Sequence, residues 1–540
     1  MRVPSDPILS CAEAGAFEKT FFAGDEAREW PAMQQAGRAV ASAVLRDFQE
    51  IGGFPEAGRL LVLVGKGHNG GDALIAAGAI LAEFPRATAD VVFAFGERPL
   101  RPLAGRAWRE FQHSAGARVS VVSRRSGEAK GVRETKSYAL SLDGVFGFQF
   151  RPPLDTRTAE LLRWANALVV GVRAAVDLPS GLDAPDAFHA DFTYATGIVK
   201  SPVLDCANAG RLRYLELDFF GSSTGILPVG LKSADHGQDA RVTVLTSGVL
   251  APLAALRSPR SDKRTYGHVF VVAGSRNYPG AALMSVLAAL HSGAGLVTAF
   301  VPESLVTAFA ARAPEAMWVG WPETPGGGLA LEGHHLLKER FSRATSLVIG
   351  PGLGREAETL ALAREIVAGS PVPLVIDADA LQPEVVRAGK APRVLTPHAG
   401  EFARIAGDVG RVPSPAKLTP DLRGEGTPPT FRVGGELRAF AKAAGATVIL
   451  KGPITRICAG EEIYHSFAGG PVLARGGSGD VLAGLTGGLL AQTPAEPMLA
   501  ACRGVLWHGL AADALARAHG QTAVMTTQLL DFLGPVLRSL

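Results

Sequence analysis

Short apolar runs that each end in a glycine-rich or charged turn recur along this chain of 540 residues. They occupy residues 60–64, 91–95 and 174–178 in the first half, and residues 269–273, 346–349, 374–376 and 446–450 in the second. A strand that is apolar at every position is buried on both faces, as in a parallel sheet with helices on each side. Helix-like stretches separate the runs, so the sequence predicts a βα alternation and an α/β fold throughout.

The length of the chain and one segment rich in small and polar residues indicate how the chain is divided into domains. A single hydrophobic core rarely organises as many as 540 residues, which predicts two or three domains. Residues 221–262 are rich in small, polar and turn-forming residues. We therefore expect a boundary near residue 235 and two α/β domains, residues 1–234 and residues 235–540.

Composition argues against several classes of protein. The 54 basic and 51 acidic residues leave a net charge of +3, which is not the excess of positive charge typical of nucleic-acid-binding proteins. The N-terminus lacks the apolar core of a signal peptide, and no apolar run is long enough for a transmembrane helix. The four cysteines have neither disulfide-framework nor zinc-site spacing. These features predict a cytoplasmic, enzyme-like protein whose partners are neither nucleic acid nor membrane.

Two strand-end motifs in the first half are suited to a nucleotide-like ligand. The segment GKGHNGGD, residues 65–72, follows a predicted strand and opens a predicted helix, where backbone N–H groups and the helix dipole can hold a phosphate. A plain strand-to-helix turn is the alternative, against which the side chain of Asn69 argues. Asp177 in VDLPSG ends another strand, where a carboxylate is well placed to act on a ligand or, alternatively, to cap the next turn.

The second half carries five further motifs at strand ends. GGSGD, residues 476–480, precedes a helix of apolar and small residues, so its amides can form an anion hole with Asp480 beside them as a base. KGPIT, residues 451–455, supplies a cation and exposed amides for nucleotide phosphates. The other three are GPGLG, LTPHAGE with His398, and VIDADAL with Asp377 and Asp379. Because the carboxyl ends of parallel strands share one edge, we expect all five on one rim of the sheet. For GGSGD alone, the alternative is a plain turn. For His398, the alternative is a hydrogen bond to a nearby loop.

The N-terminal motifs occur in an order that resembles a known family. MQQAGRAVASAVL, GKGHNGGD, SLDGVFG, VDLPSGLD and HADFTYATGIVK follow one another within residues 8–220, as in the epimerase domain of NAD(P)H-hydrate repair enzymes. The resemblance implies a K⁺ site formed by Asn69, Asp143 and Ser180, whose oxygens suit such a cation. It implies that Asp177 contacts the hydrated nicotinamide as acid and base. The other implied substrate contacts are His68, Asn69, Gly70, Gly71, Asp72, Gly147, Phe148, Gln149, Phe150 and Arg151.

Three positions depart from the family pattern. His68 stands where the family's loop has its first asparagine, Ala73 follows the loop in place of glycine, and Gln149 replaces a glycine of the FGxG segment. The larger side chains at 68 and 149 are expected to narrow the substrate pocket. An N-terminal half that has lost its chemistry, and serves only to bind a cofactor or a protein, is therefore an alternative for this half.

The C-terminal motifs look like those of the ADP/ATP-dependent NAD(P)H-hydrate dehydratase domain, over about residues 245–538. The resemblance implies that Asp480 is the base and that Ala281, Gly352, His398 and Asp480 contact the hydrate. The implied nucleotide contacts are Lys451, Gly452, Pro453, Ile454, Thr455 and Gly479. Mg²⁺ is expected as the counterion of the nucleotide, without a dedicated protein cage.

Taken together, the two resemblances imply a two-step repair enzyme. A Rossmann-like three-layer α/β/α domain would interconvert the R and S hydrates of NADH and NADPH, and a ribokinase-like doubly wound α/β domain would dehydrate the S form at the expense of ADP or ATP. The substrates are then the NAD(P)H hydrates and ADP or ATP, while the oligomeric state is left open. A ribokinase-like small-molecule kinase with a non-catalytic N-terminal domain is the alternative, which the TPHAGE motif disfavours.

Overall fold

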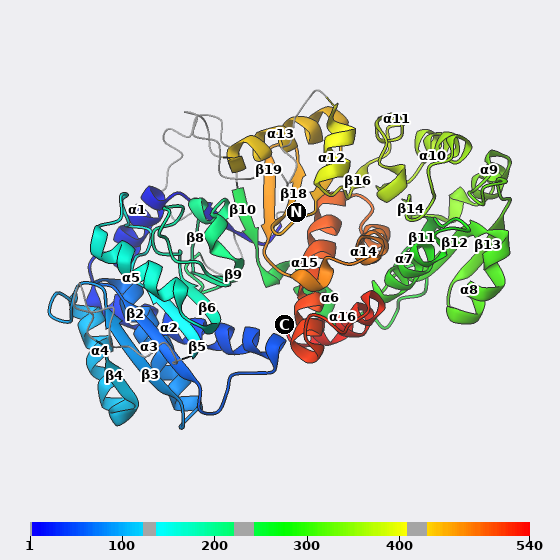
Figure 1. Cartoon of the computed structure of the whole chain (residues 1–540). Coiled ribbons are helices and arrows are strands. Elements are labelled where there is room, and N and C mark those ends of the chain that lie inside the picture. The colour runs from blue at the N-terminus through cyan, green and yellow to red at the C-terminus, as the bar shows by residue number, and fades with distance from the viewer. Residues whose placement is uncertain (1–2, 123–136, 221–241, 408–428) are drawn as a thin grey trace. The chain divides into compact units, whose positions relative to one another are not determined.

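The computed structural model describes residues 3–122, 137–220, 242–407 and 429–540 (Figure 1). These residues form two compact units, each with its own sheet. Residues 6–220 and 516–521 make the N-terminal unit, and the other described residues make the C-terminal unit. The boundary expected near residue 235 lies outside the described residues.

The N-terminal unit is built on a seven-stranded parallel sheet in the order β4-β3-β2-β5-β6-β7-β9. In that order its strands are Val119–Val121, Thr88–Phe93, Arg59–Val64, Tyr138–Gly144, Val170–Val176, Phe192–Thr196 and Arg211–Leu215. A separate short parallel pair joins β1 (Ser5–Leu9) to β8 (Val199–Lys200). All the predicted apolar runs of this half contribute to central strands.

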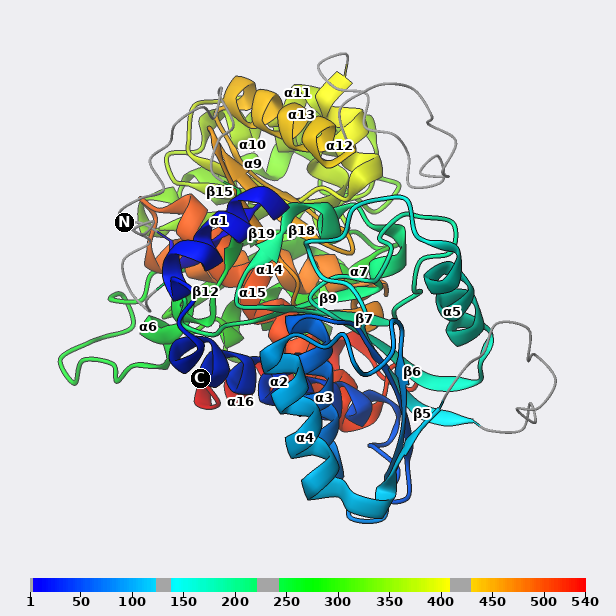
Figure 2. The same ribbon diagram turned by 90° about the vertical axis from the view of Figure 1, so that its left-hand side faces the viewer.

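Helices cover both faces of this sheet. On β2, Leu60, Val62 and Val64 pack with α2 (Glu26–Phe48), α3 (His68–Glu83) and α4 (Pro102–Ala115). The alternate residues Leu61 and Leu63 pack on the opposite side with α5 (Thr156–Ala167). Figure 2 shows α5 on one side of β5 and β6 and α2, α3 and α4 on the other. Burial of both faces explains why the strand is apolar at every position and confirms the predicted three layers.

The C-terminal unit has a sheet in the order β13-β12-β11-β14-β15-β16-β17-β18-β19-β10. The strands, in chain order from β10 to β19, are Val242–Leu245, His268–Val272, Leu296–Pro302, Met317–Trp321, Ser346–Ile349, Leu374–Ile376, Arg393–Leu395, Thr447–Leu450, Thr455–Ala459 and Glu462–Ser466. Only the pairings β17 with β18 and β18 with β19 are antiparallel. From β11 the chain runs outward to β12 and β13, and from β14 it runs the other way. The strand order therefore reverses between β11 and β14, which is where doubly wound sheets bind ligands.

Helices also cover both faces of this second sheet. One face packs against α10 (Ala357–Gly369), α12 (Ala399–Ala406) and α13 (Pro429–Ala444), and the other packs against α7 (Pro279–His291) and α14 (Ser478–Gln492). The remaining helices are α6 (Ala251–Ala254), α8 (Val306–Arg312), α9 (His334–Lys338), α11 (Pro383–Val386), α15 (Pro497–His519) and α16 (Leu529–Arg538). This confirms the predicted doubly wound α/β arrangement.

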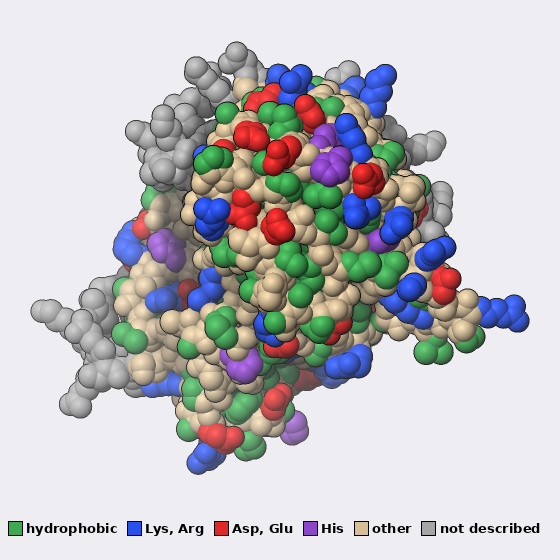
Figure 3. All heavy atoms as spheres, turned by 90° about the vertical axis from the view of Figure 1, so that its right-hand side faces the viewer, with side chains coloured by type: hydrophobic (Ala, Val, Ile, Leu, Met, Phe, Trp, Pro, Cys, Tyr) green, Lys and Arg blue, Asp and Glu red, His purple; other side chains and the backbone are tan. Residues whose placement is uncertain are grey.

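The outer surface of the C-terminal unit is mixed in character. On the face in Figure 3, acidic and basic side chains are interspersed among hydrophobic ones. In the described part of the chain, no helix combines the length and the hydropathy needed to cross a bilayer.

Glycines allow α14 to approach its neighbours unusually closely. A Cβ atom on Gly484 would lie 2.0 Å from the carbonyl oxygen of Ser285 on α7. A Cβ atom on Gly487 would lie 2.1 Å from a methyl group of Val348 on β14. This contact of α14 with α7 and β14 holds the GGSGD turn, which precedes α14, against the switch point of the sheet.

We expect Gly484→Ala to destabilise the C-terminal unit by about 1–3 kcal/mol, because a backbone carbonyl cannot move aside as a side chain does. The matched control is Gly369→Ala at the exposed end of α10, where a Cβ atom would meet nothing within 4 Å. This control should be neutral or slightly stabilising. Urea unfolding of both variants tests the expectation, and equal stability would contradict it.

Candidate active sites

A cavity of about 490 Å³ opens at the carboxyl ends of β2, β5 and β6 in the N-terminal unit. Most of the residues predicted to contact substrate line it, namely His68, Asn69, Asp72, Gly147, Phe148, Gln149, Phe150, Arg151 and Asp177. Gly70 and Gly71 do not line the cavity but allow close packing behind it. A Cβ atom at Gly70 would lie 2.5 Å from the carbonyl oxygen of Gly65, and one at Gly71 would lie 2.7 Å from the sulfur of Met33.

The GKGHNGGD segment forms the turn from β2 into α3, as predicted. The helix begins at His68, and its N-cap residue Gly67 provides no side-chain cap. Gly65 must be glycine, because a Cβ atom there would lie 1.9 Å from the carbonyl oxygen of Val145. Lys66, Gly67 and His68 all line the cavity. The positive end of the α3 dipole therefore faces the cavity, which suits an anionic group of a ligand.

The predicted cation ligands meet beneath this turn. Asp143 is fully buried and accepts hydrogen bonds from the backbone N–H and the hydroxyl of Ser180, both at 2.7 Å. Among the described residues, no basic side chain is paired with Asp143. Burial raises the pKa of Asp143 to about 6, although the hydrogen bonds from Ser180 and Val145 lower it. The amide nitrogen of Asn69 donates to the carbonyl oxygens of Phe146 and Val176, both at 2.8 Å.

Asp177 forms a buried ion pair that the sequence analysis did not foresee. Its Oδ1 lies 2.5 Å from Nζ of Lys200, and the two side chains are 3% and 2% exposed. The φ angle of Asp177 is +67°, a conformation that a residue other than glycine rarely adopts. The strand-to-loop turn therefore holds this carboxylate against Lys200 at the cavity wall. Lys200 ends the segment HADFTYATGIVK, but nothing in that segment indicates that its partner would be Asp177.

Two more carboxyl groups line the same cavity. Burial, with repulsion from Asp177 and Glu29, raises the pKa of Glu18 on α1 (Cys11–Phe22) to about 7 against the opposing effect of Lys200. The pKa of the deeply buried Asp72 also lies well above its usual value, mainly because of burial. Its Oδ1 has no hydrogen-bond partner among the described residues. Glu18 was missed by the sequence analysis, since it stands in no motif and only the fold brings α1 to this cavity.

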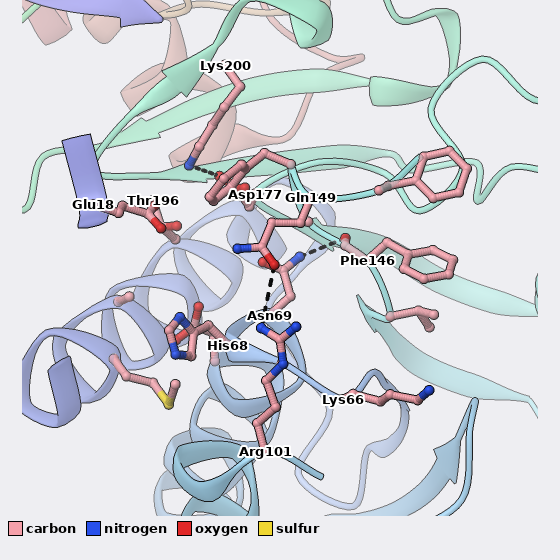
Figure 4. A pocket seen from close by; sticks show the side chains of 18 of the residues that line it. Glu18, Lys66, His68, Asn69, Arg101, Phe146, Gln149, Asp177, Thr196 and Lys200 are labelled. Atoms are coloured by element: carbon pink, nitrogen blue, oxygen red, sulfur yellow. Dashed lines mark hydrogen bonds and ion pairs between the residues drawn. The ribbon is translucent and has the colours of Figure 1, made fainter. Parts of the chain in front are cut away.

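Two of the departures from the family pattern lie at the cavity rim (Figure 4). The side chain of His68 is half exposed and its Nε2 lies 3.6 Å from Oε2 of Glu29. Burial lowers the pKa of His68, which favours its neutral form. Gln149 is exposed, and its Oε1 accepts a long 3.5 Å hydrogen bond from Arg101. Both side chains line the same cavity as Asp177 and Lys200.

In the C-terminal unit, the predicted rim motifs converge on one lysine. Lys451 directly follows β17, and its Nζ lies 3.2 Å from Oδ1 of Asp377 and 3.9 Å from Oε2 of Glu401. Gly479 sits beside it, because a Cβ atom there would lie 3.2 Å from that Nζ. Thr396 donates a 2.6 Å hydrogen bond to Oδ1 of Asp377. Asp377 therefore orients Lys451 toward the first turn of α14.

Asp480 lies in the first turn of α14, next to this lysine. Burial raises the pKa of Asp480 to about 6, with contributions from Asp377 and other acidic neighbours, and Lys451 lowers it. Its carbonyl oxygen accepts a 3.0 Å hydrogen bond from Ser285 on α7. The group thus titrates close to neutral pH, which is the range in which a carboxylate is an effective general base.

His398 is the N-cap residue of α12, a position that the sequence did not predict. Its Nδ1 accepts hydrogen bonds from the backbone N–H groups of Gly400 at 3.0 Å and Glu401 at 3.3 Å. In the neutral ring the proton is then on Nε2. The side chain is 60% exposed, and its Nε2 lies 3.4 Å from Oε1 of Glu401. Both the loop hydrogen bonds and a ligand role are compatible with this geometry.

The two small residues predicted to contact the hydrate lie together at the switch point. Gly352 has a φ angle of +62°, and a Cβ atom there would lie 2.7 Å from Cβ of Ala281 and from the carbonyl oxygen of Tyr278. Nearby, Asp379 accepts hydrogen bonds from the N–H of Gly354 at 3.1 Å and from Arg355 at 3.2 Å. Asp379 therefore stabilises the GPGLG loop. Gly452, Pro453 and Ile454 lie in the turn between β17 and β18, and Thr455 is the first residue of β18.

The predicted K⁺ site differs in its ligands from a cluster of His, Cys, Asp and Glu side chains. Within the described ranges, no group of three or more His, Cys, Asp or Glu side chains is arranged to hold a metal ion. A K⁺ ion at Asn69, Asp143 and Ser180 would instead be bound by one carboxylate with amide, hydroxyl and carbonyl oxygens. These hard oxygens fit such a cation, and Asp143 would gain a charge partner that no side chain supplies.

We expect Lys200→Met to destabilise the N-terminal unit by about 3–5 kcal/mol, because Asp177 would keep a buried charge without its partner. The double variant Asp177→Asn/Lys200→Met removes both charges and should recover most of the loss. Urea unfolding of the full chain measures both changes. Lys19→Met, at an exposed position of α1, is the control. A double variant as unstable as the single one would contradict this account of the pair.

Comparison with known proteins gives consistent matches for both units. Residues 269–534 match the family model described as NAD(P)H-hydrate dehydratase, and residues 31–201 match that of the YjeF-related protein N-terminus. The chain is 36% identical to the bifunctional NAD(P)H-hydrate repair enzyme Nnr of Gloeobacter violaceus over 534 residues, which are 95% of this chain and 94% of that protein. It is 32% identical to the Nnr enzyme of Moorella thermoacetica over 523 residues, 94% of this chain and 92% of that protein.

Solved structures resemble the C-terminal part of the chain. A ribokinase-like superfamily protein from Enterococcus faecalis is 28% identical with a TM-score of 0.45, and the match covers 57% of this chain and 98% of that one. The ADP/ATP-dependent NAD(P)H-hydrate dehydratase from Bacillus subtilis, co-crystallized with ATP and Mg²⁺, is 26% identical with a TM-score of 0.42. That match covers 53% of this chain and 93% of the Bacillus chain.

Proposed function

Since this chain belongs to the family of bifunctional NAD(P)H-hydrate repair enzymes, we propose that Asp177 and Asp480 are the catalytic groups of its two activities. The N-terminal unit is an NAD(P)H-hydrate epimerase, and the C-terminal unit is an ADP/ATP-dependent NAD(P)H-hydrate dehydratase. The observation that carries this conclusion is identity to a bifunctional relative along nearly the whole chain. A kinase with an unrelated N-terminal domain would not account for similarity in both halves.

In the epimerase site, Asp177 exchanges a proton with the hydroxyl group of the hydrated ring as the ring opens and recloses. Its support is the position of the carboxylate at the end of β6, in the cavity wall, with its charge balanced by Lys200. The N-terminus of α3 would hold the phosphates of the dinucleotide through the amides of residues 68–72. Residues 147–151 would close over the nicotinamide half.

A K⁺ ion would be held in this unit by Asn69, Asp143 and Ser180. The support is the chemistry of these donors and the burial of Asp143 without a basic partner among the described residues. When bound, the ion supplies positive charge beneath the α3 turn. The chain's own contribution is to orient three oxygen donors from α3, β5 and the loop after β6.

K⁺ should therefore raise the thermal midpoint of the N-terminal unit relative to choline at the same ionic strength. A ligand present at 100 times its Kd contributes ~2.7 kcal/mol, which corresponds to several degrees for a unit of this size. Differential scanning calorimetry in KCl and in choline chloride measures the shift. Asp143→Asn should abolish it, and an equal response of the variant would exclude this site.

In the dehydratase site, Asp480 removes the proton of the ring hydroxyl, whose oxygen attacks the terminal phosphoryl group of the nucleotide. Lys451 and the amides of Gly479 and its neighbours stabilise the charge on the transferred group. The phosphate then leaves with the C–O bond electrons while a proton is lost from the adjacent carbon, which restores the double bond. Converting hydroxide into phosphate provides a much better leaving group.

Further residues of the C-terminal unit would bind the two substrates of the dehydratase reaction. Ala281, Gly352 and the Nε2–H group of His398 would contact the hydrate, and residues 451–455 would contact the nucleotide. Mg²⁺ would accompany the nucleotide phosphates. ADP is the expected donor for this fused form. We propose the cytoplasm as the location, because the four cysteines, all in the described part of the chain, are free thiols.

Two matched variants should separate the activities. Asp480→Asn should lower nucleotide-dependent recovery of absorbance at 340 nm from the S hydrate by about 10²–10⁴-fold, because the general base is lost. Asp177→Asn should leave recovery from the S hydrate unchanged while slowing recovery from the R hydrate to the uncatalysed rate of epimer exchange. The assay contains mixed hydrates, K⁺, Mg²⁺ and either ADP or ATP. Loss of both activities in either variant would contradict this division of roles.

A further inference from the structure

Inversion of the hydrated carbon requires two proton transfers. That carbon bears a hydroxyl group and the ring nitrogen, so opening the ring takes a proton from oxygen and delivers one to nitrogen. Reclosure on the other face reverses both transfers. If each transfer has its own acid–base group, one group serves the oxygen and a second serves the nitrogen. Asp177 accounts for only one of the two.

Glu18 is the group in this cavity best placed to be the second. It lies on α1, which is tied to the site because β1, immediately before it, pairs with β8, so that Leu9 lies opposite Lys200. The apolar face of α1, with Phe17 and Phe21, packs against Ile198 and the aromatic rings that follow β9. The other face, with Glu18 and Phe22, lines the cavity. Figure 4 shows Glu18 on the side of the cavity where Thr196 lies, near Asp177 and Lys200.

The carboxyl group of Glu18 is not used elsewhere. Among the described residues it has neither a hydrogen-bond partner nor an ion-pair partner, although it is partly buried. Two other candidates are already engaged, because Lys200 is bound to Asp177 and Glu29 faces His68 at the rim.

The environments of Glu18 and Asp177 differ in the way that acid–base pairs require. Asp177 has an ammonium group at 2.5 Å, whereas Glu18 is partly buried and has no hydrogen-bond or ion-pair partner among the described residues. Burial, with repulsion from Asp177 and Glu29, raises the pKa of Glu18 to about 7 against the opposing effect of Lys200. Asp72 is the further acidic group that interacts with it. Near neutral pH a large fraction of Glu18 is therefore the neutral acid, beside a carboxylate that can act as a base.

We propose that Glu18 is the second catalytic residue of the epimerase site and transfers the proton of the ring nitrogen, an inference that rests on the proposed epimerase function. As the C–N bond breaks, Glu18 donates its proton to nitrogen while Asp177 takes the hydroxyl proton, and the carbon becomes an aldehyde. Rotation about the adjacent C–C bond presents the other face of the carbonyl. Glu18 then takes the proton back as nitrogen attacks, and Asp177 returns its proton to oxygen. Both groups are restored, and nothing is oxidised or reduced.

The test is the rate of R to S exchange of NADPH hydrate by the full chain with K⁺ and without nucleotide, followed by chromatography of the epimers. Glu18→Gln should lower kcat by about 10²–10⁴-fold with little change in KM. Glu18→Asp, which keeps a shorter carboxyl group, should retain part of the activity. Glu83→Gln, an exposed position at the end of α3, removes the same charge and should leave the rate unchanged.

The pH profile separates a catalytic role from a merely structural one. Because Glu18 must be protonated to open the ring, kcat of the unsubstituted chain should fall as pH rises through about 7. This alkaline limb should be absent from the residual activity of Glu18→Gln. Full activity in Glu18→Gln, or reduced activity with the limb intact, would overturn the inference while leaving epimerase function in place. If the unsubstituted chain does not exceed the uncatalysed exchange rate, the epimerase function fails, and the inference fails with it.

Discussion

Parallel strand order is the constraint on which both sites depend. In a parallel sheet all carboxyl ends reach one edge, so the turns that follow different strands meet there however far apart they are in the chain. The N-terminal cavity gathers the turns after β2, β5 and β6 in this way. The dehydratase rim gathers those after β11, β14, β15, β16 and β17. Glycines at several of these turns are required because the backbone segments come too close for a Cβ atom, as at Gly65 and Gly350.

The two sites also have a similar arrangement of charged side chains. Each places several carboxyl groups around one lysine, Lys200 in the N-terminal unit and Lys451 in the C-terminal unit. One carboxylate pairs with the lysine, and another is left in a buried, acidic environment that raises its pKa toward neutral pH. Glu18 in the first site and Asp480 in the second are these remaining groups. Burial and repulsion together thus yield a carboxyl group that can gain or lose a proton near pH 7.

Two of the three departures from the family pattern, His68 and Gln149, line the epimerase cavity, and the third, Ala73, is fully buried in α3. His68 and Gln149 lie at the rim, where they contact Glu29 and Arg101. The buried pair of Asp177 and Lys200 and the cluster around Asp143 lie deeper, and each of these has a defined set of partners. The side chains of His68 and Gln149 leave the pair of Asp177 and Lys200 and the hydrogen bonds of Asp143 in place.

The sequence by itself determined the α/β class, the strand positions and most of the site motifs. Fully apolar strands and glycine turns are local consequences of burial on two faces and of close backbone approach, so they can be read along the chain. The tertiary structure alone decided which side chains meet. Lys200, at the end of β8, meets Asp177, which follows β6, and Glu18 reaches the cavity because β1 pairs with β8. Such contacts join residues far apart in the chain, and the resulting burial, not the local sequence, sets the charge and the pKa of each group.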